Sequence, residues 1–270
     1  MKCDLCFHHC EVAEGKDGFC KARGCVNGSI VPLQYGKVTS IALDAIEKKP
    51  FAHFHPGSKI LSIGSSGCNF HCDFCQNYTI SQEPEPEFER VTPEDIVFLG
   101  EDMKQQGNIG IAYTYNEPLI GYEFVYDCAR LAHDHQLKNV VVTNGAISSN
   151  YLLDLLPYID AMNIDLKSIQ PKFYQDIQGN LEQVKQTIVI SSAYTHVELT
   201  TLIIPGRNDS IRDMEEEAAW IASIDPDIPL HLTRYFPAYQ CKIAPTNVDT
   251  LKELYGVARK YLNFVYLGNC

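Results

Sequence analysis

Short apolar segments alternate with longer helical segments from residue 59 to the end of this chain of 270 residues. The apolar segments are continuously hydrophobic, which is typical of parallel strands buried on both faces of a sheet. Strands are expected at residues 59–64, 109–113, 139–143, 159–165, 196–204, 230–235 and 264–267, with helices at 92–106, 119–136, 149–156, 171–178, 181–193, 210–223 and 248–262. Six strand–helix units are too few for a closed eight-unit barrel, so the pattern predicts an α/β fold, a partial (β/α)6 TIM-like barrel.

Residues 1–58 do not share this alternation, and we expect them to form a small Cys-rich N-terminal extension. Within this extension, residues 29–43 predict two short strands that form a hairpin around Tyr35-Gly36-Lys37, and residues 44–58 predict an ordered loop. The expected division is therefore a Cys-rich extension with a short hairpin at 1–58 and a partial barrel at 59–270.

The charge balance argues against two classes of partner. The chain has 34 acidic and 22 basic side chains, a net charge of −12, whereas nucleic-acid binding needs a basic face. An anionic membrane surface is disfavoured for the same reason, and no apolar run approaches the ~20 residues of a membrane span. The first ten residues contain no apolar signal region, so we expect a cytoplasmic protein without nucleic-acid or membrane partners.

The cysteines are numerous and clustered. There are 11 of them, and eight fall within residues 1–75. An odd number with this clustering favours metal or cluster ligation in a reducing compartment over a disulfide framework.

The most specific cysteine pattern is Cys68-x3-Cys72-x2-Cys75, in the loop after the first expected barrel strand. Three thiolates on one short loop can hold three irons of a [4Fe–4S] cluster and leave the fourth iron open for a substrate. A structural site would need a fourth ligand, such as His71 or the distant Cys25. A zinc site and unliganded cysteines remain as alternatives to the open cluster.

This triplet, with Phe74 before its last cysteine, resembles the signature of radical S-adenosylmethionine (radical SAM) enzymes. Residues 114–118 (TYNEP) resemble that superfamily's Gly-Gly-Glu-Pro motif, with Tyr115 and Asn116 in place of the glycines. The whole chain is similar to the branch typified by pyruvate formate-lyase activase, and closer still to the radical SAM enzyme of the AmmeMemoRadiSam system. That closer similarity lies in residues 44–58, 67–77 (GCNFHCDFCQN), 114–118 and 234–237 (RYFP).

The resemblance implies an enzyme that reductively cleaves S-adenosylmethionine (SAM) at a [4Fe–4S] cluster held by Cys68, Cys72 and Cys75. The resulting 5′-deoxyadenosyl radical then abstracts hydrogen from a substrate, with a flavodoxin or ferredoxin-like protein as electron donor. By analogy with glycyl-radical activases, a protein or peptide substrate is favoured. The same chemistry on a small molecule and a non-catalytic Fe–S or zinc protein are the alternatives.

Polar residues at the ends of the expected strands supply the SAM contacts that the resemblance implies. Glu117 is expected to hold the SAM amino group and Lys167 to pair with the SAM carboxylate. Asp165 is expected to bond the ribose hydroxyls or to orient Lys167. The other expected cofactor-binding residues are Phe74 near the adenine, Asn116, Asn144 and His231.

A second group of cysteines lies in the N-terminal extension, at Cys3, Cys6, Cys10 and Cys20. Four soft ligands on a segment too small for its own core favour a metal-nucleated fold, with zinc or an auxiliary cluster. The alternative is a set of reduced, partly buried thiols that pack on the barrel.

Overall fold

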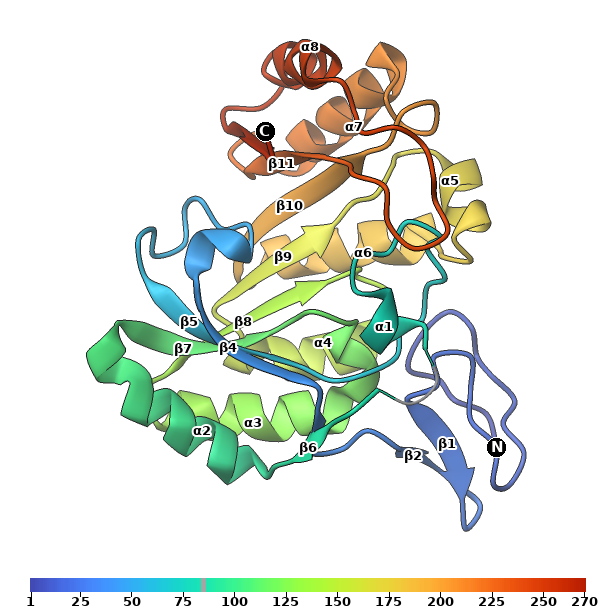
Figure 1. Cartoon of the computed structure of the whole chain (residues 1–270), viewed down its shortest axis with the longest axis vertical. Coiled ribbons are helices and arrows are strands. Elements are labelled where there is room, and N and C mark those ends of the chain that lie inside the picture. Colours follow the sequence, from blue (N-terminus) through green and yellow to red (C-terminus); the bar gives the residue numbers. More distant parts are fainter. Residues whose placement is uncertain (84–85) are drawn as a thin grey trace.

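A computed structural model describes residues 1–83 and 86–270 (Figure 1). In this part of the chain the main sheet has eight strands in the order β12-β11-β10-β9-β8-β7-β5-β4. All neighbours from β5 to β12 pair in parallel, and only the edge strand β4 is antiparallel. The strands are β4 (Ser40–Ala45), β5 (Lys59–Gly64), β7 (Asn108–Tyr113), β8 (Lys138–Thr143), β9 (Ala161–Asp165), β10 (His196–Ile203), β11 (Leu230–Arg234) and β12 (Val265–Gly268).

Helices connect the parallel strands and wrap the outer face of the curved sheet (Figure 1). The predicted α/β partial barrel is therefore confirmed, with the chain order of the strands preserved across the sheet. The α-helices are α1 (Tyr78–Ser81), α2 (Pro93–Asp102), α3 (Tyr122–Asp134), α4 (Ser149–Leu155), α5 (Pro171–Asp176), α6 (Leu181–Ser192), α7 (Ile211–Ile224) and α8 (Val248–Ala258). Short 3-10 helices are η1 (Ile46–Lys48), η2 (Met103–Gln106), η3 (Pro118–Gly121) and η4 (Leu156–Tyr158).

Helix α2 begins where its capping residues predict. The Thr92 hydroxyl accepts a hydrogen bond from the Asp95 amide at 3.2 Å, and the Asp95 carboxylate accepts one from the Thr92 amide at 2.8 Å. Pro93 occupies the first helical position, where its missing N–H costs nothing. These contacts fix the start of the helix that crosses from β5 to β7.

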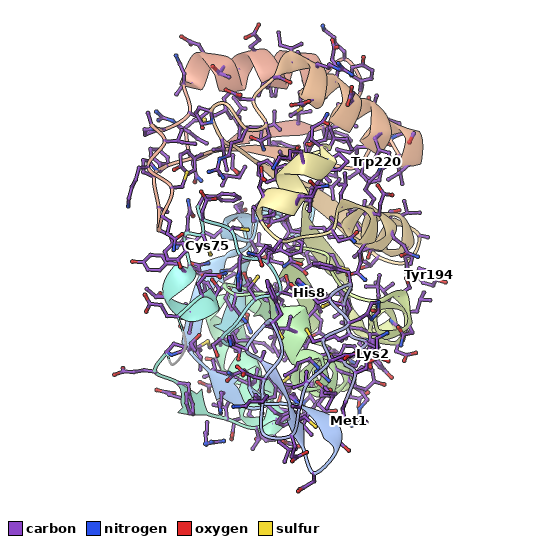
Figure 2. All side chains as sticks on the ribbon, turned by 90° about the vertical axis from the view of Figure 1, so that its right-hand side faces the viewer. Met1, Lys2, His8, Cys75, Tyr194 and Trp220 are labelled. Atoms are coloured by element: carbon purple, nitrogen blue, oxygen red, sulfur yellow. The ribbon has the colours of Figure 1, made fainter. Side chains whose placement is uncertain are left out.

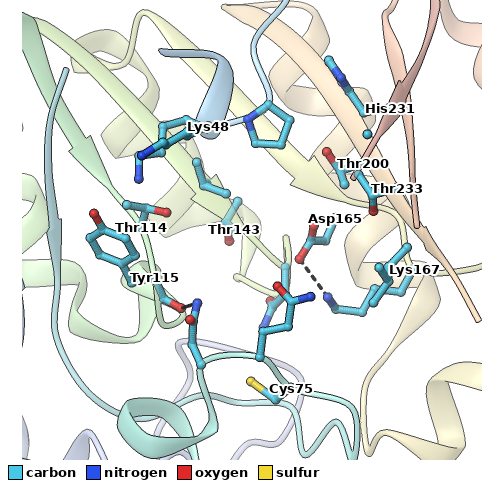
Figure 3. A pocket seen from close by; sticks show the side chains of 18 of the residues that line it. Lys48, Cys75, Thr114, Tyr115, Thr143, Asp165, Lys167, Thr200, His231 and Thr233 are labelled. Carbon is cyan, nitrogen blue, oxygen red and sulfur yellow. Dashed lines mark hydrogen bonds and ion pairs between the residues drawn. The ribbon is translucent and has the colours of Figure 1, made fainter. Parts of the chain in front are cut away.

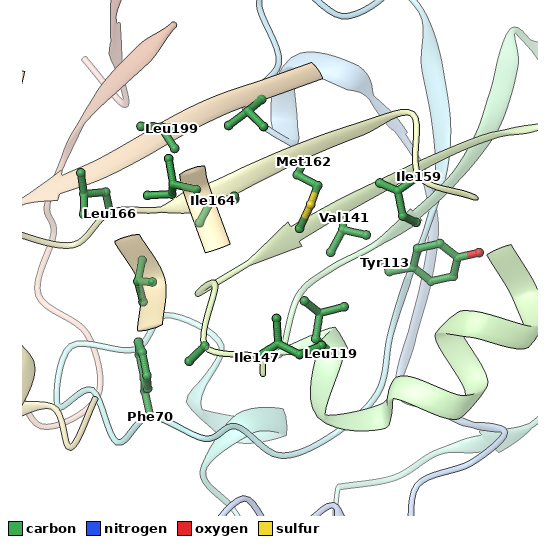
Figure 4. Packing of buried hydrophobic residues seen from close by; sticks show 14 of the residues in the cluster. Phe70, Tyr113, Leu119, Val141, Ile147, Ile159, Met162, Ile164, Leu166 and Leu199 are labelled. Atoms are coloured by element: carbon green, nitrogen blue, oxygen red, sulfur yellow. The ribbon is translucent and has the colours of Figure 1, made fainter. Parts of the chain in front are cut away.

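The core lies between the sheet and its helices. Figure 4 shows Val141, Met162, Ile164 and Leu199 from three adjacent parallel strands packed together, and all four are fully buried. Burial on both faces of these strands explains their continuous hydrophobic character. At the β7–β8 pair, a Cβ on Gly110 would lie 1.8 Å from the Lys138 carbonyl oxygen, so only glycine permits this approach.

The N-terminal extension differs from the expected pairing. The hairpin consists of β1 (Arg23–Val26) and β2 (Ser29–Pro32), not of strands around Tyr35. Its turn is Asn27-Gly28, with φ of 51° and 72°, a dipeptide that favours two-residue hairpin turns. The segment beyond it separates into β3 (Lys37–Val38), which pairs with β6 (Glu89–Arg90), and β4, which extends the main sheet.

The buried carboxyl group of Glu217 on α7 predicts a pH-dependent stability. It accepts a hydrogen bond from the Thr201 hydroxyl at 2.6 Å, and burial raises the pKa of Glu217 to about 8. A raised native pKa makes the folded state lose stability as pH rises from about 4.5 to about 8. We expect Glu217→Gln to remove this loss, so its Tm should exceed that of the wild type increasingly from pH 5 to pH 8. Glu253→Gln, at an exposed site on α8, is the control; equal pH profiles for all three proteins would contradict the prediction.

Candidate active site

A cavity of about 1000 Å³ lies inside the partial barrel and reaches the carboxyl ends of the parallel strands. Cys68, Cys72 and Cys75 line it from the loop after β5. In Figure 3, Cys75 lies at one end of the cavity, Lys48 and His231 lie at the other, and the Asp165–Lys167 pair lies between them. The structure thus brings the predicted cysteines and the predicted polar strand ends to one site.

The loop that carries the three cysteines, residues 67–77, is held in a compact form. Gly67 has a φ of 89°, and a Cβ there would lie 2.4 Å from the Cys20 carbonyl oxygen, so the N-terminal extension packs directly on this loop. The Phe70 amide lies 3.3 Å from the Cys68 sulfur and can donate to it. Burial raises the pKa of the Cys72 thiol to about 12, so a thiolate there needs a compensating positive charge such as iron.

The thiols fit a cluster with an open iron. In the described part of the chain, no cysteine other than Cys68, Cys72 and Cys75 lines the cavity. Nor do any three His, Cys, Asp or Glu side chains among residues 1–83 and 86–270 converge closely enough to hold one metal ion. Three thiols without a fourth cysteine at the cavity suit a cluster whose fourth iron stays open.

The residues after β7 tie the cysteine loop to the barrel. The Asn116 side chain accepts from the Ser65 amide at 2.9 Å and donates to the Gly67 carbonyl at 3.1 Å. Tyr115 adopts a φ of 72°, the conformation that a glycine would adopt without strain. Its hydroxyl donates to Asp44 at 2.7 Å, and the Lys49 ammonium lies 4.2 Å above its ring. These contacts stabilise the strained turn that replaces the two glycines of the related motif.

Glu117 is buried, and its carboxylate accepts three hydrogen bonds from the protein. The donors are the Leu119 amide at 3.0 Å, the Thr143 hydroxyl at 2.7 Å and the Asn144 amide at 2.7 Å. Burial raises the pKa of Glu117 to about 7, even though these donors oppose the shift. Glu117 therefore fixes the end of β8, where the Asn144 side chain lies 3.6 Å from the Cys68 sulfur. Its expected contact with the SAM amino group stays a prediction.

Asp165 and Lys167 form an ion pair at the end of β9. The Lys167 ammonium lies 2.8 Å from the Asp165 carboxylate, and both residues line the cavity (Figure 3). The lysine side chain is only 15% exposed, so its charge is directed into the site and not into bulk solvent. Asp165 is thus placed where it can orient Lys167, and the roles of both residues toward SAM stay predictions.

His231 is oriented by Glu198, a partner that the sequence pattern does not identify. The buried Glu198 carboxylate accepts from His231 Nε2 at 2.7 Å and from the backbone amides of Ala52 and His53 at 2.9 and 2.8 Å. Although burial opposes ionisation, hydrogen bonds from two histidines and these amides hold the pKa of Glu198 well below its ordinary value. The His231 ring stacks on Tyr266, with centroids 5.3 Å apart. A charged residue within the apolar strand β10 was the available signal for this network.

Phe74 is buried beside the cluster cysteines and lines the cavity, with its ring centroid 5.9 Å from that of Phe173. Its expected position near the adenine stays a prediction. Its neighbour Asp73 forms a two-fold ion pair with Arg207 at 2.7 and 2.6 Å. The Asp73 carbonyl also accepts from the Cys241 amide at 2.9 Å, so the cysteine loop is anchored to segments far away in the sequence. Sequence reasoning did not find this pair.

The comparison with known families decides the assignment. The family model of the radical SAM superfamily matches residues 62–221, more than half of the chain. This chain belongs to the radical SAM superfamily. The resemblance seen in the sequence is confirmed, and the chain is an enzyme of a family that uses a [4Fe–4S] cluster and SAM.

The radical SAM enzyme has relatives of several kinds. It is 40% identical to an uncharacterized protein of Methanocaldococcus jannaschii, MJ0808, over 100% of this chain and 81% of the relative. It is 27% identical to the 4-hydroxyphenylacetate decarboxylase activating enzyme of Clostridium scatologenes, over 52% of this chain and 46% of that enzyme. A radical SAM methyltransferase from Sphaerobacter thermophilus has the same fold, with a TM-score of 0.62, 15% identity and coverage of 79% and 67%.

No helix in residues 1–83 and 86–270 is both long enough and apolar enough to cross a membrane.

Proposed function

We propose that this radical SAM enzyme abstracts a hydrogen atom from a protein or peptide substrate. The observation that carries the proposal is the cavity, which joins three cluster-binding thiols at one end to a polar region around His231 at the other. When bound, the cluster and SAM would supply a 5′-deoxyadenosyl radical for hydrogen abstraction from the substrate. The protein binds and orients these groups and excludes water from them.

The residues that would hold the two groups come from successive strand ends. Cys68, Cys72 and Cys75 would ligate three irons, and Lys167, oriented by Asp165, would pair with the SAM carboxylate. The remaining expected SAM contacts are Phe74, Asn116, Glu117, Asn144 and His231, all of which line the cavity.

A protein substrate is supported by two observations. The relative from Clostridium scatologenes is an activating enzyme. According to its name, the protein that it activates is a decarboxylase. The net charge of −12 suits association with a partner that carries basic patches. A flavodoxin or ferredoxin-like protein would supply the electron. The same proposal places a second metal at Cys3, Cys6, Cys10 and Cys20, whose side chains line one small cavity.

The test follows deuterium into 5′-deoxyadenosine. An extract of fully deuterated cells of the source organism is separated into macromolecules and small molecules, and each fraction is incubated anaerobically with the enzyme, SAM and dithionite. We expect deuterated 5′-deoxyadenosine only from the macromolecular fraction, and expect protease treatment of that fraction to abolish the label. Label from the small-molecule fraction alone would overturn the protein substrate while leaving the radical chemistry intact.

A further inference from the structure

The N-terminal residues 1–22 are ordered with very little regular structure. They make only isolated bridges, such as Lys2–Glu11 and Asp17–Gly24, yet Leu5 and Val12 are each 2% exposed. Figure 2 shows this segment, with Met1, Lys2 and His8, lying against the barrel. A segment of this size, without helices or a sheet of its own, needs another element to fix its conformation. The four thiols Cys3, Cys6, Cys10 and Cys20 line one small internal cavity at its centre.

A backbone amide approaches one of these sulfurs as another approaches a cysteine of the active site. The amide of Phe70 lies 3.3 Å from the sulfur of Cys68, and the amide of Phe19 lies 3.5 Å from the sulfur of Cys10. Amide donors to sulfur are the usual surroundings of ligating thiolates.

A buried cation lies against the same cavity. Arg23 is 5% exposed and lines the cavity, and its two terminal nitrogens bind Glu123 at 2.7 Å each. Its Nε, in contrast, is buried and has no hydrogen-bond partner among the described residues. A buried donor without a partner is costly, and the thiolates of a cluster in this cavity would offer an acceptor to the Arg23 Nε.

The arrangement of the four thiols favours an iron–sulfur cluster over a single zinc ion. In the described part of the chain, no three potential ligands lie close enough together to hold one ion, whereas the ligands of a tetrahedral zinc site surround a single ion. The same is true of Cys68, Cys72 and Cys75, the residues that resemble the cluster ligands of the family. We propose that Cys3, Cys6, Cys10 and Cys20 ligate a second [4Fe–4S] cluster. All four of its irons have protein ligands, so it has no open position for SAM.

The second site adjoins the first. The Asn69 side chain accepts from the Asn144 side chain at 2.8 Å, and the Asn69 carbonyl lies 2.9 Å from His8 Nε2. The Phe19 ring stacks between the rings of His8 and His71, at 3.9 and 4.2 Å. A cluster in the extension therefore also positions the loop that carries Cys68, Cys72 and Cys75. The inference specifies the second metal of the proposed function and is independent of the substrate.

The test removes the active-site cluster and asks what metal remains. Iron, sulfide and zinc are measured per chain in protein purified without oxygen, and the reduced protein is examined by electron paramagnetic resonance with and without SAM. We expect about eight irons per wild-type chain and about four in the Cys68→Ala/Cys72→Ala/Cys75→Ala variant, from two [4Fe–4S] clusters and from one. The spectrum of the variant should not respond to SAM, because every iron is already ligated.

Further replacement of Cys6→Ser and Cys20→Ser in that variant should remove the remaining iron, whereas Cys128→Ala, at a buried thiol on α3, should not. Circular dichroism establishes that each variant is folded. A folded triple variant that contains no metal, or one zinc per chain and no iron, would overturn the second cluster. A wild-type chain with only about four irons, all lost in the triple variant, would do the same.

Discussion

Replacing Cys72 by alanine is expected to abolish formation of 5′-deoxyadenosine from SAM. Cys72 is 8% exposed, and in the described chain only Cys68 and Cys75 share its cavity, so no other thiol can take its place. Two thiolates cannot hold the cluster with a single open iron. The measurement is chromatographic detection of 5′-deoxyadenosine after anaerobic incubation with SAM and dithionite, together with the iron content of the purified variant.

The matched control for this experiment is Cys128→Ala. Cys128 is fully buried on α3, outside the cavity, so its replacement also removes a buried thiol. The control should retain both its iron and its product. Wild-type amounts of 5′-deoxyadenosine from Cys72→Ala would show that Cys72 is not a cluster ligand.

Lys167→Met is expected to weaken SAM binding by roughly 10- to 100-fold, the effect of losing one charged hydrogen bond. The Lys167 ammonium faces the cavity and pairs with the Asp165 carboxylate at 2.8 Å. The substitution also leaves the Asp165 carboxylate uncompensated, which disfavours an anionic SAM carboxylate nearby. The dissociation constant is measured by anaerobic equilibrium dialysis with labelled SAM, and the iron content should not change.

Lys172→Met is the control for Lys167, because the Lys172 side chain on α5 is 76% exposed and pairs with Asp176 at the surface. This variant should bind SAM as the wild type does, since surface ion pairs contribute little. Equal affinities for SAM in the wild type and in Lys167→Met would remove Lys167 from the binding site.

The parallel barrel could be predicted because its determinants are local. Each buried strand is a short apolar run, and Thr92 and Pro93 mark a helix start without reference to the rest of the chain. The position of the active site could also be predicted, because functional side chains on parallel strands gather at the carboxyl ends of those strands. This is why Thr143, Asp165 and Lys167 meet the cysteine loop in one cavity.

Other features depend on contacts that no local pattern encodes. Asp73 pairs with Arg207 across 134 residues, and Glu198 reaches the amides of Ala52 and His53 across about 145. The expected position of the hairpin is wrong because two strand-like segments, β3 and β4, pair with β6 and β5 and not with each other. Strand pairing and register are decided by tertiary packing, which a single sequence does not show.

The bonds from Ala52 and His53 to Glu198 hold the segment after η1 across the inside of the barrel, and His53 also lies 2.6 Å from the Tyr266 hydroxyl. Residues 48–52 thereby line the cavity, with Lys48 at the end opposite Cys75. Part of the wall that a substrate would meet therefore comes from the N-terminal extension and not from the strands of the barrel.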